Sequence, residues 1–446
     1  MTTSLPRPRP GQNRPAPRKP TPRRPAQRQP TQRQPPPEPS PSSPAVVVAV
    51  KRIFGAESGN YFLLLGATLF LVVFGLVMVL SSSAVESYKA TDDFFTGFLR
   101  QGLFALLGIP LMLVAARLPA VFWRKWAGLA MIIAIALQFL VIATSLGIEH
   151  NGNRNWILLG TFSFQPSELV KVALVVWLGV ILAKKIDVLD DWRELVRPIG
   201  IVAGAAIALV LFGGDLGTVI ILVAIVLGAL FFAGVRLRLL VIPTIVVALG
   251  ALAMSFSSAR SNRILAWQSG CSTDADFNGL CWQTLHGWWA LASGGLFGVG
   301  LGNSKAKWSW LPEADNDFIF AIIGEELGLL GAIIVLALFI VLAISFVRII
   351  RASTDNLARI TVSAIMVWIL GQAFVNIAVV LGLLPVLGVP LPLISAGGSA
   401  LVTTLFAIGI VLSFARHPAE ASQQPPPQQP PPSQQPQPSQ QQRVSR

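Results

Sequence analysis

The sequence is poor in charge: Asp, Glu, Lys and Arg make up 12% of its 446 residues, whereas soluble globular proteins carry roughly 25%. Hydrophobic residues make up 53%, and the mean hydropathy is +0.64. These values exclude a soluble globular protein. At about 20 apolar residues per membrane-spanning helix, the chain has material for about ten spans, which also excludes a single-span anchor and a peripheral enzyme.

The formal net charge of +13 is concentrated at the N-terminus. Residues 1–52 contain eleven Lys and Arg and one acidic residue, whereas residues 53–417 contain 21 basic and 19 acidic residues. Because the body of the chain is nearly neutral, we predict no nucleic-acid partner. A basic segment beside a membrane can contact anionic lipid, so the N-terminal tail either helps to fix orientation or docks a partner.

Both ends have the composition of disordered segments. Residues 1–52 are rich in Pro, Arg and Gln, and residues 418–446 are rich in Pro, Gln and Ser. Neither can bury enough apolar surface to offset the entropy lost on folding. We therefore predict two disordered cytoplasmic tails on either side of a polytopic membrane domain at 53–417.

Ten apolar runs predict an all-α integral membrane protein. Lys and Arg gather in alternate loops, and the positive-inside rule then places both termini in the cytoplasm. The longest loop, about 257–316, falls between spans seven and eight on the exoplasmic side. The predicted spans lie near 61–82, 101–116, 127–146, 168–183, 198–212, 216–233, 238–256, 317–346, 358–381 and 398–415.

Cysteine is nearly absent from the chain. The two that occur, Cys271 and Cys281, both lie in the long exoplasmic loop. Disulfides persist on that side of the membrane, and we predict a bond between the two. The alternative is a pair of free thiols, which would be exposed and reactive.

Polar residues at the predicted exoplasmic ends of the spans form four clusters, and ionisable residues at membrane depth mark function by default. In the first, Glu168 and Lys171 follow Pro166 at a spacing that puts both on one helix face, where they can pair. The alternative is a purely structural ion pair. The preceding loop supplies Arg154 and Trp156, of which the Trp could equally be an interfacial belt residue.

The second and third clusters supply further carboxylates. Asp215 stands before an apolar run, where it could cap the next helix or take part in catalysis. Asp317 stands at the mouth of another apolar run, close after Glu313, and partial desolvation there would make it a useful base. A Gly-rich string with Lys305 and Lys307 precedes it and lacks the pattern of a nucleotide-binding loop.

The fourth cluster is rich in proline. Pro385, Pro390 and Pro392 forbid a regular helix, and Ser395 and Ser399 follow them. Irregular backbone at membrane depth is tolerated only when it is buried in protein or lines a cavity. We therefore expect this segment to line one.

These four clusters, in this order, resemble the SEDS family (shape, elongation, division and sporulation) of cell-wall polymerases over about residues 55–416. The chain departs from the family pattern at Asp315-Asn316, Ala396 and Gly213-Gly214, and no motif carboxylate is lost. The matching strings are Gln-Pro-Ser-Glu-Leu-x-Lys at 165–171, Leu-Pro-Glu at 311–313, Asp-Phe-Ile-Phe-Ala at 317–321, Gly-Glu-Glu-Leu-Gly at 324–328, Leu-Pro-x-x-Gly at 384–388 and Pro-Leu-Ile-Ser-x-Gly-Gly-Ser at 392–399.

The resemblance implies a glycosyltransferase that polymerises lipid II at the outer face of the cytoplasmic membrane, with Asp317 as the base. It also implies a class B penicillin-binding transpeptidase and other division proteins as partners. The lipid pyrophosphate leaving group would need a divalent cation (Mg or Mn) or basic side chains, for which the candidates are Lys171, Arg154, Lys305 and Lys307. The remaining candidates for substrate binding are Trp156, Glu168, Asp215, Glu313, Ser395 and Ser399.

Two alternatives stay open at this point. A flippase or ion-coupled carrier would also have many spans, broken exoplasmic segments and membrane carboxylates. Apart from Glu325 and Glu326, the cytoplasmic halves of the spans carry few charges, which disfavours a transport path. Within the same chemistry, an elongation enzyme is the alternative to a septal, cell-division enzyme, which the Gly-Glu-Glu-Leu-Gly string and the long tails favour.

Overall fold

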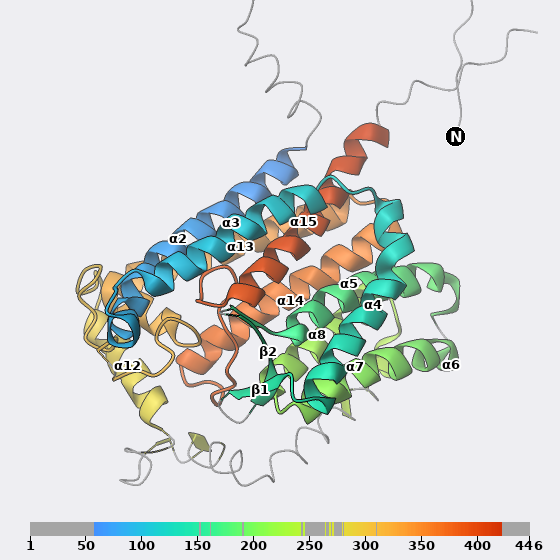
Figure 1. Ribbon diagram of the computed structural model, residues 1–446. Helices are drawn as coiled ribbons and strands as arrows, with labels where there is room; N and C mark the ends of the chain where they lie inside the picture. The colour runs from blue at the N-terminus through green and yellow to red at the C-terminus, as the bar shows by residue number, and fades with distance from the viewer. Residues whose placement is uncertain are drawn as a thin grey trace, which may run out of the picture. The chain divides into compact units, whose positions relative to one another are not determined.

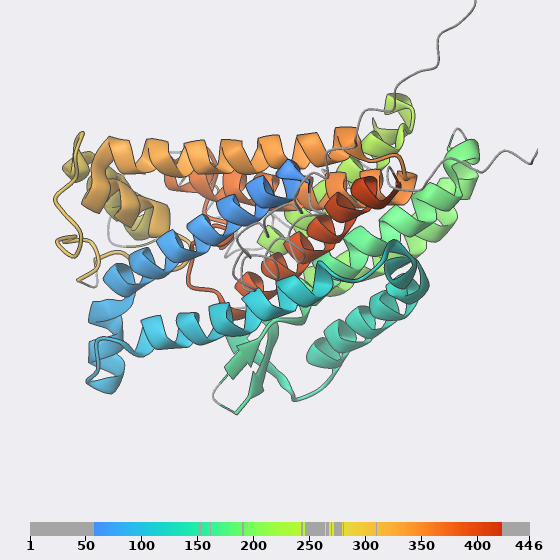
Figure 2. The ribbon, with the colours of Figure 1, turned by 90° about the horizontal axis from the view of Figure 1, so that it is seen from above.

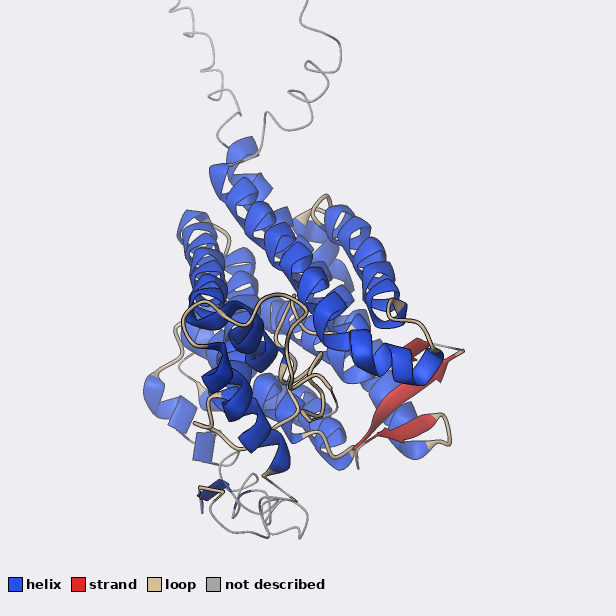
Figure 3. Ribbon diagram, turned by 90° about the vertical axis from the view of Figure 1, so that its left-hand side faces the viewer, coloured by secondary structure: helices blue, strands red, loops and turns tan. Residues whose placement is uncertain are grey.

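In the computed structural model, the chain divides into two units, Met1–Ile53 and Phe54–Arg446. The structure describes residues 58–150, 153–160, 162–189, 191–241, 281–308 and 310–421, together with isolated positions between 244 and 279. All of these belong to the second unit. They are mostly helical, with one small sheet confined to a corner of the helical body (Figure 3).

Among the described residues, nine helical segments are long and apolar enough to cross a membrane. They correspond to nine of the ten predicted spans; most of the remaining one, near 238–256, lies outside the described residues. The helices are α2 (Gly59–Thr91), α3 (Thr96–Ala115), α4 (Ala120–Ala143), α5 (Pro166–Lys184), α6 (Trp192–Leu195), α7 (Ile201–Phe212), α8 (Leu216–Ala233), α12 (Trp282–Gly294), α13 (Ile319–Ala352), α14 (Asn356–Val380) and α15 (Gly398–Ala421) (Figure 1). A 3₁₀ turn, Ile186–Val188, and a π turn, Val196–Gly200, lie on either side of α6.

The helices differ in how much of their apolar surface the protein itself covers. Within the most apolar part of each helix, 83% of α5 and 78% of α15 is buried, compared with 28% of α3, α4 and α13. Helices α5, α8, α14 and α15 therefore form the centre (Figure 1), and the others leave apolar faces for lipid. At Gly179 of α5, a side chain would overlap the Thr361 hydroxyl of α14, so a small residue permits this close approach.

Two features of the predicted exoplasmic segments were not expected from the sequence. The loop before α5 forms an antiparallel sheet of β1 (Gly147–His150), β2 (Asn153–Leu159) and β3 (Phe162–Phe164), with Ile157 opposite both Gly147 and Phe164. The predicted loop at 257–316 contains α12, which packs against the start of α13 (Figure 2). Strands this short lack a long alternating pattern, and α12 is too short to resemble a span.

Helix α13 is interrupted at Gly328, whose φ of 68° is left-handed. The Gly-rich segment after α12 bonds to the interrupted turn: the Val299 N–H donates to the Glu325 carbonyl at 2.9 Å, and the Gly300 N–H donates to the Glu326 carbonyl at 3.0 Å. The Leu329 N–H donates back to the Gly295 carbonyl. The glycines therefore allow one backbone to pair with another beside α13.

Candidate active site

The predicted exoplasmic ends of the helices surround a cavity of about 750 Å³. Its walls come from β2 and β3, the starts of α5, α8 and α15, and two irregular segments, 313–317 and 386–390. Seven of the residues singled out in the sequence line it: Trp156, Glu168, Lys171, Asp215, Glu313, Asp317 and Ser399. Motifs that are up to about 240 residues apart in sequence thus share one chamber.

Glu168 and Lys171 form an ion pair in the first two turns of α5, as their spacing predicts. Lys171 Nζ lies 2.8 Å from Glu168 Oε1, and both side chains are almost fully buried. Pro166 begins the helix, where its missing N–H costs no intrahelical bond. The Thr403 hydroxyl of α15 donates to the second carboxylate oxygen of Glu168 at 3.2 Å.

Helix α14 completes the surroundings of Lys171. The ammonium donates to Gln372 Oε1 at 3.1 Å and lies 5.0 Å from the centre of the Trp368 ring. The Trp368 indole N–H donates to the same Gln372 oxygen. Because the ion pair is desolvated and bonded on several sides, its members hold α5, α14 and α15 together as well as facing the cavity.

Asp215 occupies the N-cap of α8, the simpler of the two roles considered for it. Its Oδ1 accepts from the Thr218 N–H at 2.8 Å, and its Oδ2 accepts from the Gln165 amide at 2.9 Å. Burial raises the pKa of Asp215, and the Thr218 hydrogen bonds oppose that rise. Since its carboxylate also lines the cavity, capping does not remove it from the site.

The turn before Asp215 is held by a buried amide pair. Asn155 of β2 donates from Nδ2 to the Gly213 carbonyl at 2.9 Å and accepts at Oδ1 from Gln138 of α4 at 2.6 Å. A side chain at Gly213 would overlap the Asn155 amide. This contact gives a physical reason for glycine at one position where the chain departs from the family pattern.

Asp317 is the carboxylate with the least compensation. Its Oδ1 is buried and has no hydrogen-bond partner among the described residues. Desolvation raises the pKa of Asp317 to about 7, and the nearby carboxylates of Glu313, Asp215 and Asp315 add to the rise. A group with this pKa can accept a proton near neutral pH.

The backbone around Asp317 is fixed by the residues that surround it. Asn376 of α14 donates from Nδ2 to the carbonyls of Asp317 and Val389, each at 2.7 Å. The Ser395 hydroxyl donates to the Asn316 carbonyl at 2.7 Å, and the Ala396 N–H donates to the Asp315 carbonyl at 2.8 Å. The proline-rich segment therefore holds the loop that carries Asp317.

Asp315 does not share this position. Its side chain is not among those that line the cavity, and desolvation, with the charges of Glu86 and Glu313, raises its pKa to about 6. Helix α13 begins only at Ile319, so Asp315 and Asp317 both lie in the preceding loop. The conformation of that loop, and not a helical period, places Asp317 at the cavity and Asp315 outside its lining.

Four predicted substrate-binding residues lie outside the cavity lining. Arg154 is exposed and donates to the Thr144 carbonyl, and Ser395 is buried in the loop contacts described above. Lys305 is exposed, and its backbone N–H donates to Glu325 Oε1. A direct role in the chamber is therefore not supported by where these side chains lie.

The fourth of these residues, Lys307, belongs to a separate buried cluster at the interrupted turn of α13. Its ammonium lies 3.2 Å from Glu326 Oε1 and donates to the Gly302 carbonyl at 2.6 Å. Ser81 of α2 donates to the same carboxylate. Lys307 therefore stabilises the contact between α2, α13 and the Gly-rich segment.

Arg100 was missed as a site residue. It lies in the first turns of α3, lines the cavity and donates from Nη2 to the Ser163 hydroxyl of β3 at 2.9 Å. Among the residues that line the cavity, Lys171 is the other cation, and it is paired with Glu168. In the sequence, Arg100 is an ordinary charge at a span end, and β3, which supplies its partner, was not predicted.

The two loop cysteines, Cys271 and Cys281, are joined by a disulfide. Among the described residues, no group of three or more His, Cys, Asp and Glu side chains is placed to hold a metal ion. The donor set therefore does not favour a resident divalent cation held by protein ligands alone. The cation stays a prediction.

The sequence matches the cell cycle protein family of FtsW, RodA and SpoVE over residues 62–420. It is 40% identical over 374 residues to the probable peptidoglycan glycosyltransferase FtsW of Mycobacterium tuberculosis, covering 82% of this chain and 71% of that protein. It is 37% identical over 358 residues to the stage V sporulation protein E of Bacillus subtilis, covering 80% and 96%.

Solved structures have the same fold. The rod shape determining protein RodA of Thermus thermophilus is similar with a TM-score of 0.58 and 26% identity, over 80% of this chain and 96% of that chain. A chain from a peptidoglycan synthase complex is similar with a TM-score of 0.65 and 24% identity, over 80% and 97%. Together with the intact motifs, these matches confirm the predicted relationship: the chain is a multi-pass membrane protein of the FtsW, RodA and SpoVE family.

Proposed function

We propose that this protein is a peptidoglycan glycosyltransferase that polymerises lipid II into glycan strands at the outer face of the cytoplasmic membrane. The observation that carries the proposal is Asp317, a carboxylate of raised pKa in a cavity at the predicted exoplasmic side. The curated relatives that carry the same activity in their names support it.

In the proposed reaction, Asp317 acts as a general base. Its carboxylate takes the proton of the acceptor sugar 4-hydroxyl while that oxygen attacks the anomeric carbon of the donor. The new glycosidic bond forms as the bond between the anomeric carbon and the phosphate oxygen breaks, and the lipid diphosphate leaves with the electron pair. The unbonded Oδ1 of Asp317 supplies an acceptor site that no side chain of the described residues occupies.

The leaving diphosphate requires positive charge in the cavity. Arg100 is placed to supply it, because its guanidinium lines the chamber without a carboxylate partner among the bonds described for it. A guanidinium can bind phosphate oxygens in a bidentate manner. Lys171 adds charge from deeper in the wall, where Glu168 already offsets much of it.

The acceptor and donor sugars would contact the polar wall of β2 and β3. Trp156, Asn153 and Gln165 line this side of the cavity, and they supply an aromatic face with amide donors and acceptors. Ser399, at the start of α15, lines the cavity as well. These residues would orient the sugars so that the acceptor hydroxyl meets Asp317.

We further propose a septal role in cell division with a class B penicillin-binding transpeptidase as partner. The 40% identity to an FtsW protein, against 26% to a RodA protein, supports division over elongation. The solved complex with a similar fold belongs to a peptidoglycan synthase that coordinates polymerization and crosslinking. We also propose other division proteins and membrane lipids as partners of this chain.

The test is reconstitution of the purified full-length chain in liposomes with lipid II, with and without the transpeptidase. We expect polymer on a gel with the wild type and none with Asp317→Asn. Fluorescent lipid II in the same vesicles distinguishes transport of lipid II across the bilayer from its polymerisation. Movement of lipid II across the bilayer without polymer under any condition would overturn the polymerase proposal and favour a flippase.

A further inference from the structure

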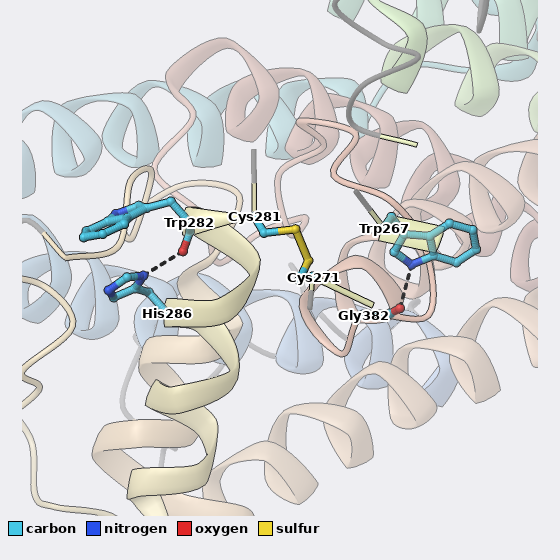
Figure 4. Close-up of a disulfide and its surroundings, with 6 residues drawn as sticks. All are labelled: Trp267, Cys271, Cys281, Trp282, His286 and Gly382. Atoms are coloured by element: carbon cyan, nitrogen blue, oxygen red, sulfur yellow. Dashed lines mark hydrogen bonds between the residues drawn. A yellow bond between two sulfur atoms is a disulfide. The ribbon is translucent and has the colours of Figure 1, made fainter. Parts of the chain in front are cut away.

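The Cys271–Cys281 disulfide connects α12 to the turn that carries Trp267, whose indole contacts the turn after α14. Cys281 is the N-cap residue of α12, and Cys271 lies in a turn in which the Gly270 N–H donates to the Trp267 carbonyl. Both Gly270 and Cys271 have positive φ, which makes the turn tight. Figure 4 shows the disulfide between the two cysteines, with Trp267 reaching away from it.

Trp267 bonds to the turn that ends α14. Its indole N–H donates to the Gly382 carbonyl at 2.8 Å (Figure 4). Gly382 has a φ of 78°, and a side chain there would overlap the ring of Trp288 from α12. The turn is therefore held between two indole rings, one on α12 and one joined to α12 through the disulfide.

The segment that follows this turn forms the cavity wall next to the proposed base. Residues 386–390 line the cavity, and a Cβ at Gly388 would lie 3.4 Å from Asp317 Oδ2. The far end of the segment is fixed by Asn376 and Gln372, which donate to the carbonyls of Val389 and Pro390. Trp267 provides the corresponding contact at the near end.

We propose that Trp267, held by the Cys271–Cys281 disulfide, is a positioning residue for the wall that faces Asp317. The inference rests on the proposed polymerase function and adds a residue that does not itself reach the cavity. Without the contact to the Gly382 carbonyl, the near end of the wall keeps its hydrogen bonds to the end of α14 but loses its link to the disulfide-held turn. Substrate still binds, but the distance between base and acceptor hydroxyl is less well defined, so turnover falls more than affinity.

Trp267→Phe tests the contact because it removes the indole N–H and keeps an aromatic ring. Trp288→Phe is the matched control, since this indole packs on the same turn and its N–H has no hydrogen-bond partner among the described residues. We expect Trp267→Phe to lower kcat for lipid II about fivefold, the effect of one neutral hydrogen bond, with KM changed less than twofold. Trp288→Phe should leave kcat closer to that of the wild type.

Reduction tests whether the disulfide acts through Trp267. Dithiothreitol, which donates two electrons and two protons to the disulfide, should lower kcat of the wild type to the level of Trp267→Phe. It should have no further effect on Trp267→Phe. The Cys271→Ser/Cys281→Ser double variant should match the reduced wild type, with or without reductant.

Hydrogen exchange separates failure of this inference from failure of the proposed function. The N–H groups of Leu383 and Leu384 donate to the Ala378 carbonyl, and their exchange should accelerate in Trp267→Phe and in the reduced wild type, whatever the protein's activity. An equal loss of turnover on reduction in wild type and Trp267→Phe, or unchanged exchange in both, would overturn the proposal. Indistinguishable behaviour of Trp267→Phe and Trp288→Phe would do so as well.

Discussion

Glu168 and Asp317 are carboxylates in the same cavity, and they differ in what surrounds them. Glu168 is bonded to Lys171 and Thr403, whereas one oxygen of Asp317 has no partner among the described residues and its neighbours are further carboxylates. Removing either partner of a buried ion pair leaves an uncompensated charge, so such a pair ties together the helices that supply it. An uncompensated one is available for chemistry, so the surroundings of each carboxylate indicate its role.

Neutralising Asp317 should have the largest effect. Asp317→Asn should lower polymerisation by about 10²- to 10⁴-fold, the usual contribution of a general base, with membrane insertion and lipid II binding retained. Gel analysis of polymer from the purified variant measures the loss, and a lipid II binding assay on the same sample measures retention. Asp315→Asn is the matched control and should be much milder, because its side chain lies outside the cavity lining.

A second prediction concerns the pair itself. Glu168→Gln or Lys171→Met alone leaves a buried charge without its partner, at a cost of about 3–5 kcal/mol in stability, and each should also reduce activity. The double variant should lose less than the sum of the single losses. Thermal unfolding in detergent and polymerisation rates complete the double-mutant cycle; strictly additive losses would show that the two residues act independently.

The third and smallest change tests the cation at the cavity wall. Arg100→Gln should lower turnover about 10- to 150-fold, because a hydrogen bond to a charged group contributes roughly 1.5–3 kcal/mol, and Arg100→Lys should restore part of it. Arg154→Gln is the control, since Arg154 does not line the cavity and its guanidinium donates to the Thr144 carbonyl. Equal losses in the two variants would remove Arg100 from the proposed site.

Much of the helical architecture and the main carboxylates could be predicted from the sequence. Long apolar runs have few alternatives in a membrane, and a three-residue spacing after Pro166 is enough to pair Glu168 with Lys171. The cap at Asp215 follows from a short polar residue before an apolar run. These features depend on local sequence, so they could be predicted without a structure.

The remaining parts of the site depend on where distant segments meet. Lys305 and Lys307 are close to Asp317 in sequence. The segment that carries them contacts the interrupted turn of α13 instead, where Lys307 pairs with Glu326. Arg100 enters the site because β3 supplies Ser163 beside it. Neither contact is indicated by the local sequence. Proximity to Asp317 in the sequence therefore did not identify which basic residues line the cavity.

The pH dependence of turnover shows whether Asp317 acts as the base. Asp317 accepts a proton only in its ionised form, so the rate should be constant well above its pKa of about 7 and fall tenfold per pH unit below it. Removing a neighbouring negative charge with Glu313→Gln should move the midpoint to lower pH, because that charge helps to raise the pKa of Asp317. A rate that stays constant between about pH 5 and 8, or a midpoint that Glu313→Gln leaves unchanged, would contradict Asp317 as the uncompensated base.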